Sequence, residues 1–320
     1  MTMLDQNDVS VLAKLLCIRD KDGRAELRIG LLATMFLADP WTRSVREAVT
    51  HAAEDYIRQF RSHLRWAVDS TSHIHPMDSG KVLFPREWLP QHEDGQTWHF
   101  GFHGGDCDEA ASDVQVSAFG PSNVRKQGLG YFQLYLPVTW FAEHPETTFH
   151  DLVLKFANRL RPLSGYAGIG VLESIDFDAR QKSGETVRKI AERFPGLEIE
   201  DCIGHGIYAE KGIKGVNWLT LLGDRWIQDI GGLEYLRIRL GDDFKLTPYE
   251  GGLMIQAGPN PQIGDVTTNR WPRHYVTLAK VLKPIQIKVH GEFHWGDPMG
   301  VQKRMDHAAS LAWLFRFDGK

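Results

Sequence analysis

Apolar residues occur along this chain in two patterns, as short continuous runs and as stretches with helical spacing. Residues 27–36 form an apolar run typical of a buried strand, which ends at Asp39-Pro40. Thr42 then marks the start of a helix to about residue 62, because the apolar positions that follow recur every three or four residues. The apolar pattern of residues 64–68 predicts another strand. The pattern therefore predicts a strand-helix-strand unit.

The same order of elements recurs twice more. A second unit is expected from a strand at 131–140, a helix from Thr147 to Leu160 and a strand at 166–172. A looser third unit is expected from a strand at 253–257, a helix at 273–282 and a strand at 285–289. Further strands at 98–102 and 114–119, and helices at 183–194 and 224–240, are expected between the units. Because strands neither alternate strictly with helices nor form separate blocks, the predicted class is α+β with a mixed sheet.

These units predict one α+β domain over residues 27–320. Within it, internal pseudo-repeats are expected over about 27–125, 130–240 and 244–318. Residues 1–26 contain apolar positions at helical spacing, and we expect them to form an N-terminal helical extension.

Composition narrows the functional classes. With 320 residues, of which 42% are hydrophobic, the chain can bury a large core. A net charge of -4 gives no bulk attraction to nucleic acid or to an anionic membrane surface, so neither is expected as a direct partner. No run of about 18 apolar residues predicts a membrane span. Three cysteines without a paired spacing predict neither a disulfide framework nor a zinc ribbon, and without a secretion signal we expect a cytoplasmic protein.

Histidines offer the most evident candidate chemistry. His73, His75, His99 and His103, followed by Asp106, have the residue types of a divalent metal site, and a metal-dependent hydrolase is the alternative functional hypothesis. The first pair lies in a Ser/Pro/Asp-rich stretch instead of following an apolar strand, which favours histidines without a metal. Neither GxSxG, HExxH nor a phosphate-binding loop occurs. We therefore expect no enzyme, metal or cofactor.

The block GIKGVNWLTLLGD, from Gly212 to Asp224, is the most informative segment. Its glycines surround an apolar, strand-forming core that contains no nucleophile or general base. We predict a structural motif in which Gly212, Gly215 and Gly223 occupy turns with positive φ and Trp218 is buried. Together with FGFHGGD at 100–106 and GYAGIG at 165–170, it indicates a protein that binds rather than catalyses.

Acidic residues suggest where a partner binds. The stretch 104–121 contains no Arg or Lys. It contains four carboxylates, namely Asp106, Asp108, Glu109 and Asp113. The functional interpretation is an anionic surface complementary to a basic partner, and the alternative is a solvated loop. Trp98 and Phe102 are candidate apolar anchors if they are exposed. A second acidic cluster comprises Glu198, Glu200 and Asp201.

Several blocks together resemble a known family. In chain order they include LRIGLLATMFLADPW, TWHFGFHGGD, LRPLSGYAGIG, GIKGVNWLTLLGD and GGLMIQAGPNPQIGD, and the resemblance extends from about Leu27 to Asp318. They are similar to the TsiV-like immunity proteins of type VI secretion. The resemblance implies a cognate effector toxin as partner, a nuclease with a basic cleft, which the protein neutralises by stoichiometric occlusion in the cytoplasm. It implies no catalytic residues.

Overall fold

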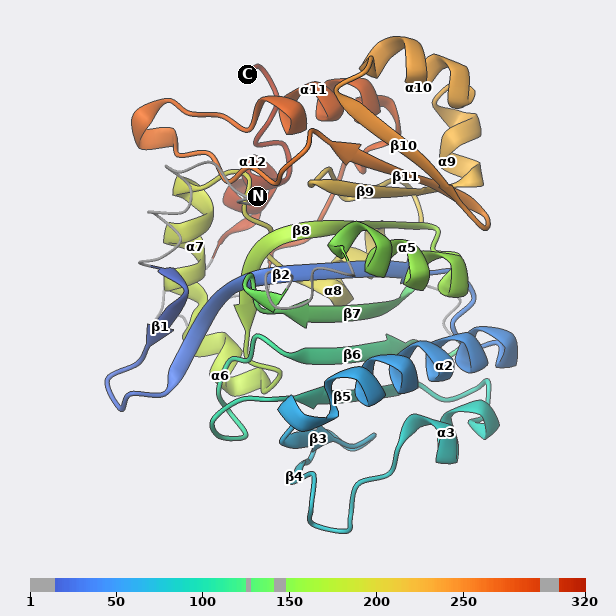
Figure 1. The fold of residues 1–320 in the computed structure, drawn as a ribbon, viewed down its shortest axis with the longest axis vertical. Helices are drawn as coiled ribbons and strands as arrows, with labels where there is room; N and C mark the ends of the chain where they lie inside the picture. The colour runs from blue at the N-terminus through green and yellow to red at the C-terminus, as the bar shows by residue number, and fades with distance from the viewer. Residues whose placement is uncertain (1–14, 125–127, 141–147, 294–304) are drawn as a thin grey trace.

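A computed structural model describes residues 15–124, 128–140, 148–293 and 305–320. Its strands form an 11-stranded sheet in the order β10-β11-β9-β8-β2-β7-β6-β5-β3-β4, with β1 paired to β2 (Figure 1). The strands are β1 Cys17–Arg19, β2 Ala25–Leu37, β3 Trp66–Val68, β4 Ile74–Pro76, β5 Trp98–His103, β6 Gln115–Gly120, β7 Gly130–Leu136, β8 Ser164–Glu173, β9 Leu219–Gly223, β10 Phe244–Tyr249 and β11 Gly252–Ala257.

Helices lie on both faces of this sheet and around one of its edges (Figure 1). The helices are α2 Arg43–Phe60, α3 Pro85–Trp88, α5 Phe149–Leu160, α6 Phe177–Lys182, α7 Gly184–Arg193, α8 Cys202–Tyr208, α9 Asp224–Asp229, α10 Gly232–Leu240, α11 Arg273–Leu282 and α12 His307–Leu314. Short 3-10 turns are η1 Arg61–His63, η2 Leu89–Gln91, η3 Val266–Thr268 and η4 Lys283–Ile285. Helices α2 and α5 cover one face, and α8 contacts β7 from the other. No helix among the described residues is both long and apolar enough to cross a membrane.

Strand pairing confirms the predicted α+β class. Each ladder between the named strands is antiparallel. Parallel pairing occurs at two isolated bridges in the described residues, Gly170 with Glu198 and Ile213 with Gln286. The mixed character of the sheet is therefore limited to short contacts beside the main ladders.

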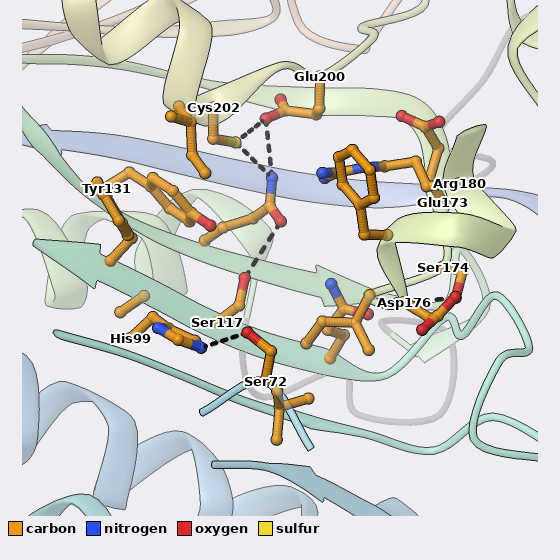
Figure 2. Close-up of a pocket in the computed structure, with 18 of the residues that line it drawn as sticks. Ser72, His99, Ser117, Tyr131, Glu173, Ser174, Asp176, Arg180, Glu200 and Cys202 are labelled. Carbon is orange, nitrogen blue, oxygen red and sulfur yellow. Dashed lines mark hydrogen bonds between the residues drawn. The ribbon is translucent and has the colours of Figure 1, made fainter. Parts of the chain in front are cut away.

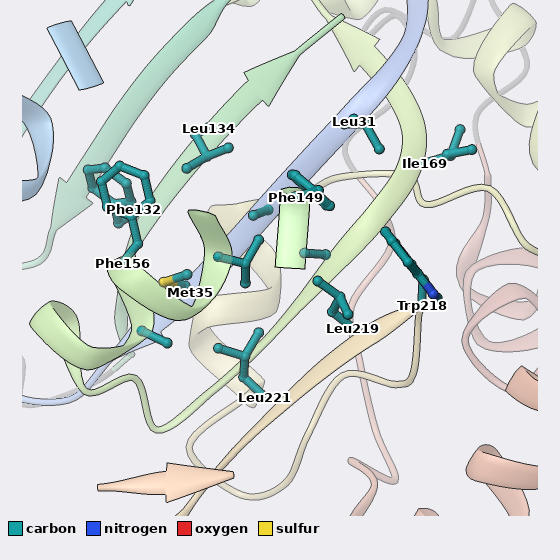
Figure 3. Packing of buried hydrophobic residues seen from close by; sticks show 14 of the residues in the cluster. Leu31, Met35, Phe132, Leu134, Phe149, Phe156, Ile169, Trp218, Leu219 and Leu221 are labelled. Carbon is teal, nitrogen blue, oxygen red and sulfur yellow. The ribbon is translucent and has the colours of Figure 1, made fainter. Parts of the chain in front are cut away.

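The face under α2 and α5 is apolar. Met35 of β2 and Phe132 of β7 are cross-strand neighbours, and the Phe132 ring lies 5.6 Å from that of Phe156 on α5 (Figure 3). Phe149, at the start of α5, stacks on Trp218 with ring centroids 6.2 Å apart. Burial of each such side chain contributes roughly 1.5–3 kcal/mol, so these contacts hold α5 on the sheet.

The opposite face carries a row of buried polar side chains. Ser117 of β6 pairs with Gln133 of β7, and Gln133 in turn pairs with Thr34 of β2. Side chains at paired positions point to the same face of a sheet, so the three lie side by side. This polar row positions the candidate site.

Several local predictions differ from the structure. Within the predicted helical extension, residues 1–14 lie outside the described part of the chain, and the rest contributes strand β1 and the start of β2. The third unit has no closing strand at 285–289, because the chain forms η4 and then only the bridge from Gln286 to Ile213. The predicted cap Thr147 is outside the described residues, and Thr148 caps α5 by accepting from the Asp151 amide.

The prediction that the glycines of the GIKGVNWLTLLGD block have positive φ is wrong. Gly212, Gly215 and Gly223 are not among the residues with positive φ. A Cβ on Gly212 would instead lie 2.6 Å from the Ile285 carbonyl oxygen, and one on Gly223 would lie 2.8 Å from that of Leu163. Close backbone approach therefore requires glycine at these two positions. Trp218 is buried as predicted, with 5% of its surface exposed.

Candidate functional site

A cavity of about 540 Å³ opens over the polar face of the sheet (Figure 2). Strands β6 and β7 supply its floor through Ser117, Tyr131 and Gln133. The segment from Glu173 to Arg180, which runs from the end of β8 into α6, forms one wall, and the start of α8 forms another. Ser72 and His99 lie on the remaining side, where the Ser72 hydroxyl is 3.1 Å from His99 Nε2.

A hydrogen-bond network closes the inner wall of the cavity. Glu200 Oε2 accepts from Thr34 Oγ1 at 3.0 Å and from Gln133 Nε2 at 2.8 Å. The Cys202 thiol donates to the same oxygen at 2.7 Å. Ser117 Oγ donates to Gln133 Oε1 at 3.3 Å, which extends the network across β6, β7 and β2 (Figure 2). The polar row thus anchors the segment that carries Glu200 and Cys202.

The electrostatics of this network disfavour a nucleophilic cysteine. Burial raises the pKa of Cys202 well above its ordinary value, and the adjacent Glu200 carboxylate raises it further. Burial also raises the pKa of Glu200, against the opposing effect of the Lys214 charge. Reactive cysteines need a lowered pKa, so Cys202 acts as a hydrogen-bond donor.

Glu173 forms a second buried acidic position at the end of β8. It is 2% exposed, and burial raises its pKa to about 8 while the charge of Arg180 opposes that rise. Ser183 Oγ donates to Glu173 Oε1 at 3.4 Å. This carboxyl is therefore held largely in its protonated form at neutral pH.

Lys214, within the GIKGVNWLTLLGD block, makes a buried ion pair behind the cavity. Its Nζ donates to Glu198 Oε1 at 2.6 Å, to the Ile199 carbonyl at 2.8 Å and to the Tyr166 hydroxyl at 3.1 Å. Asn217 Nδ2 donates to the other Glu198 oxygen at 3.0 Å. The block therefore holds the segment leading to Glu200, a role that the apolar pattern did not predict. A lysine between two glycines in an apolar block was the available signal.

The histidines do not form the ligand set of the alternative hypothesis. His75 Nε2 lies 2.9 Å from Asp69 Oδ2, whereas His99 bonds with Ser72 on the cavity wall. His103 is buried, which lowers its pKa to about 4, and its Nδ1 accepts from the Gly105 amide. Over the described residues, no three His, Cys, Asp or Glu side chains are grouped to hold a metal ion. The metal-dependent hydrolase has no such site there.

The acidic residues of the 104–121 stretch lie close to arginines that are distant in sequence. Arg65 is 3.7 Å from Asp106 and Arg28 is 3.4 Å from Asp113, while Arg24 pairs with Glu109. Asp108 is exposed. The expected anionic surface is therefore partly neutralised by arginines of the β1–β2 region and by Arg65, just before β3.

Burial contradicts the prediction that Trp98 and Phe102 anchor a partner. Trp98 is 0% exposed and donates its indole N–H to the Pro40 carbonyl, and Phe102 is 1% exposed. Both pack in the core, since neighbouring strands and α2 cover that face of β5, so neither meets the condition of exposure. The second acidic cluster is also buried: Glu198, Glu200 and Asp201.

Exposed apolar side chains that the sequence analysis missed lie at the mouth of the cavity. Phe177 at the start of α6 is 56% exposed, and Ile203 on α8 is 48% exposed. Both line the cavity. Phe177 and Ile203 lie in two short helices that are far apart in sequence, so only the tertiary structure shows that they share one opening.

An α+β fold with a polar cavity and an apolar mouth has the features of a protein that binds another molecule. The chain belongs to the family described as type VI immunity for VRR-NUC, whose model matches residues 48–317. Its function is therefore type VI immunity against a VRR-NUC nuclease effector.

A solved structure is similar over nearly the whole chain. It is the Pseudomonas aeruginosa T6SS protein PA0821, with 25% sequence identity and a TM-score of 0.86. The similarity covers 99% of this chain and 92% of that one. No curated protein matches the sequence.

Proposed function

We propose that this protein neutralises its cognate VRR-NUC effector by stoichiometric occlusion, in the cytoplasm and without catalysis. The family match over residues 48–317 carries this proposal. A protonated Cys202 thiol and the separated histidines support binding as the mode of action. A nuclease acts on cellular DNA, so its inhibitor has to meet it in the same compartment.

Charge complementarity supports the mode of inhibition. A nuclease binds the phosphate backbone through lysine and arginine, so we propose that the effector presents a basic cleft. An inhibitor with a net charge of -4 is attracted to that cleft and does not itself bind DNA. Covering the cleft then excludes the substrate.

A titration of nuclease activity tests the stoichiometry. Purified effector is mixed with increasing amounts of the immunity protein, and DNA cleavage is followed by fluorescence. We expect activity to fall linearly and to end at one equivalent, with a complex of the two chains in size-exclusion chromatography. Inhibition by a small fraction of an equivalent that grows with time would show catalysis, and unchanged cleavage at excess would refute neutralisation.

The acidic residues Asp106, Asp108, Glu109 and Asp113 are proposed as one contact with the basic cleft. Asp108 is exposed, so its charge acts on an approaching partner with least interference from the neighbouring arginines. Asp108→Lys should slow association and weaken its salt dependence. Asp242→Lys, at an exposed position after α10, is the matched control. Equal association rates for both variants from low to physiological salt would remove this stretch from the interface.

A further inference from the structure

The cavity over β6 and β7 is rich in carboxyl groups. Among the described residues that line it, the acidic side chains are Glu173, Asp176, Asp178, Glu200 and Asp201, and the one Lys or Arg is Arg180. Five carboxyl groups thus face one arginine. Asp178 is exposed in the first turn of α6, whereas Glu173 and Glu200 lie at the inner wall.

Acceptor atoms in the cavity wall lack a hydrogen-bond donor among the described residues. Gln115, 3% exposed, and Asp201, 7% exposed, both line the cavity. Gln115 Oε1 and Asp201 Oδ2 are buried and have no hydrogen-bond partner within the described part of the chain. Buried acceptors are normally satisfied, so the cavity lacks donors. A group that completes the cavity has to supply N–H donors, and the surrounding carboxyl groups favour one with a positive charge.

The apolar mouth of the cavity favours a cationic side chain with an apolar stem. The exposed rings and methyl groups of Phe177 and Ile203 lie beside the acidic interior. Arginine has an apolar stem and a planar head with five N–H donors, so its stem can pack at an apolar mouth while its head reaches carboxylates. A volume of about 540 Å³ leaves room for part of the loop that carries such a side chain.

We propose that this cavity is the docking pocket for an arginine-bearing loop of the effector, with the guanidinium inside and the loop packed on Phe177 and Ile203. The proposal rests on the proposed function, in which the partner is a basic nuclease. It places the specific contact at α6 and α8, while the 104–121 stretch steers the encounter.

Release of protons on binding distinguishes this pocket from a contact at the surface. Glu173 faces Arg180, Glu200, Asp201 and the Ser183 hydroxyl, and Glu200 faces Lys214, Glu198, Cys202 and Tyr166. Burial raises the pKa of both carboxyls, and an entering guanidinium favours their ionised forms. Binding should therefore release protons and tighten as pH rises from 6 to 8.

Binding of a catalytically inactivated cognate effector tests the pocket. Ile203→Lys places an ammonium group at the mouth and should weaken binding about 100-fold, because like charges brought together cost several kcal/mol. Ile238→Lys is the matched control, since Ile238 is an exposed isoleucine on α10 away from the cavity. It should bind like the unmodified protein. Thermal unfolding of both variants verifies the fold.

A second variant identifies the chemistry of the occupant. Asp178→Asn removes an exposed charge of the pocket. In a double-mutant cycle, its effect on the binding free energy should be non-additive with that of replacing one effector arginine by methionine. Calorimetry in buffers of different ionisation enthalpy should show proton release. Normal binding by Ile203→Lys, or additive effects for each effector arginine, would overturn the pocket while leaving immunity intact. Absence of any binding by the unmodified protein would overturn the proposed function as well.

Discussion

The buried carboxyl of Glu173 should make the stability of this protein depend on pH in the neutral range. Its folded pKa of about 8 exceeds the ordinary value of 4.5, so between these pH values the folded state binds more protons than the unfolded state. The free energy of unfolding therefore falls as pH rises through this window. A rise from 4.5 to about 8, at 1.36 kcal/mol per pH unit, corresponds to at most about 5 kcal/mol, most of which is lost as pH rises to 8 and the rest above it.

Glu173→Gln isolates this contribution. The carboxamide has no proton to lose, and its oxygen can still accept from Ser183 Oγ. Urea unfolding at pH 5, 6, 7 and 8 should show the unmodified protein losing stability relative to the variant as pH rises, with the variant more stable at pH 8. Glu192→Gln, at an exposed carboxylate on α7, is the control and should follow the unmodified protein. The lowered pKa of Asp265, about 2, affects stability only at more acidic pH.

Parallel curves for the unmodified protein and Glu173→Gln between pH 5 and 8 would refute this reasoning. That result would mean that Arg180 offsets the burial of the carboxyl and keeps it ionised. Glu173 and Arg180 would then form a buried ion pair, and the pKa of Glu173 would be low.

Three further outcomes are expected from other parts of the fold. Trp218→Ala should lower the free energy of unfolding by about 3–5 kcal/mol because it leaves a cavity beside α5, and an unchanged denaturation midpoint with lost protection would instead identify an interface residue. Lys214→Met should lower the free energy of unfolding by at most about 3–5 kcal/mol, measured by urea unfolding, because the buried Glu198 carboxylate loses its closest cation and keeps Arg316, 3.7 Å from its other oxygen; adding Glu198→Gln should restore part of that stability. His73→Ala and His75→Ala should leave protection of effector-producing cells intact, and loss of bound metal or of hydrolysis in either variant would support the enzyme hypothesis.

Elements with a strong local pattern could be predicted from the sequence. Helix α11 has the predicted bounds, α7 differs by one residue at each end, and the helical stretch at 224–240 is interrupted between α9 and α10, where Gly231 and Gly232 have positive φ. Helical periodicity and glycine breaks act over a few residues, so the sequence expresses them directly. The family blocks were likewise sufficient to indicate the immunity function.

The candidate site depended on contacts between distant segments. Thr34 and Glu200 are 166 positions apart, and Gln133 and Cys202 are 69 apart, so no local pattern indicates that they share one network. For the same reason, Glu200 looked like part of a charged surface, and Trp98 looked like an available anchor.

Sequence alone therefore determined the class of the fold, the local helices, the burial of Trp218 and the family. Tertiary structure decided which carboxylates are buried, which arginines neutralise the 104–121 stretch, and where Phe177 and Ile203 meet at one opening. The physical reason is that hydrophobic periodicity and backbone preference are properties of neighbouring residues. Desolvation and charge pairing arise only when the sheet brings β2, β6, β7 and the segment before α8 together.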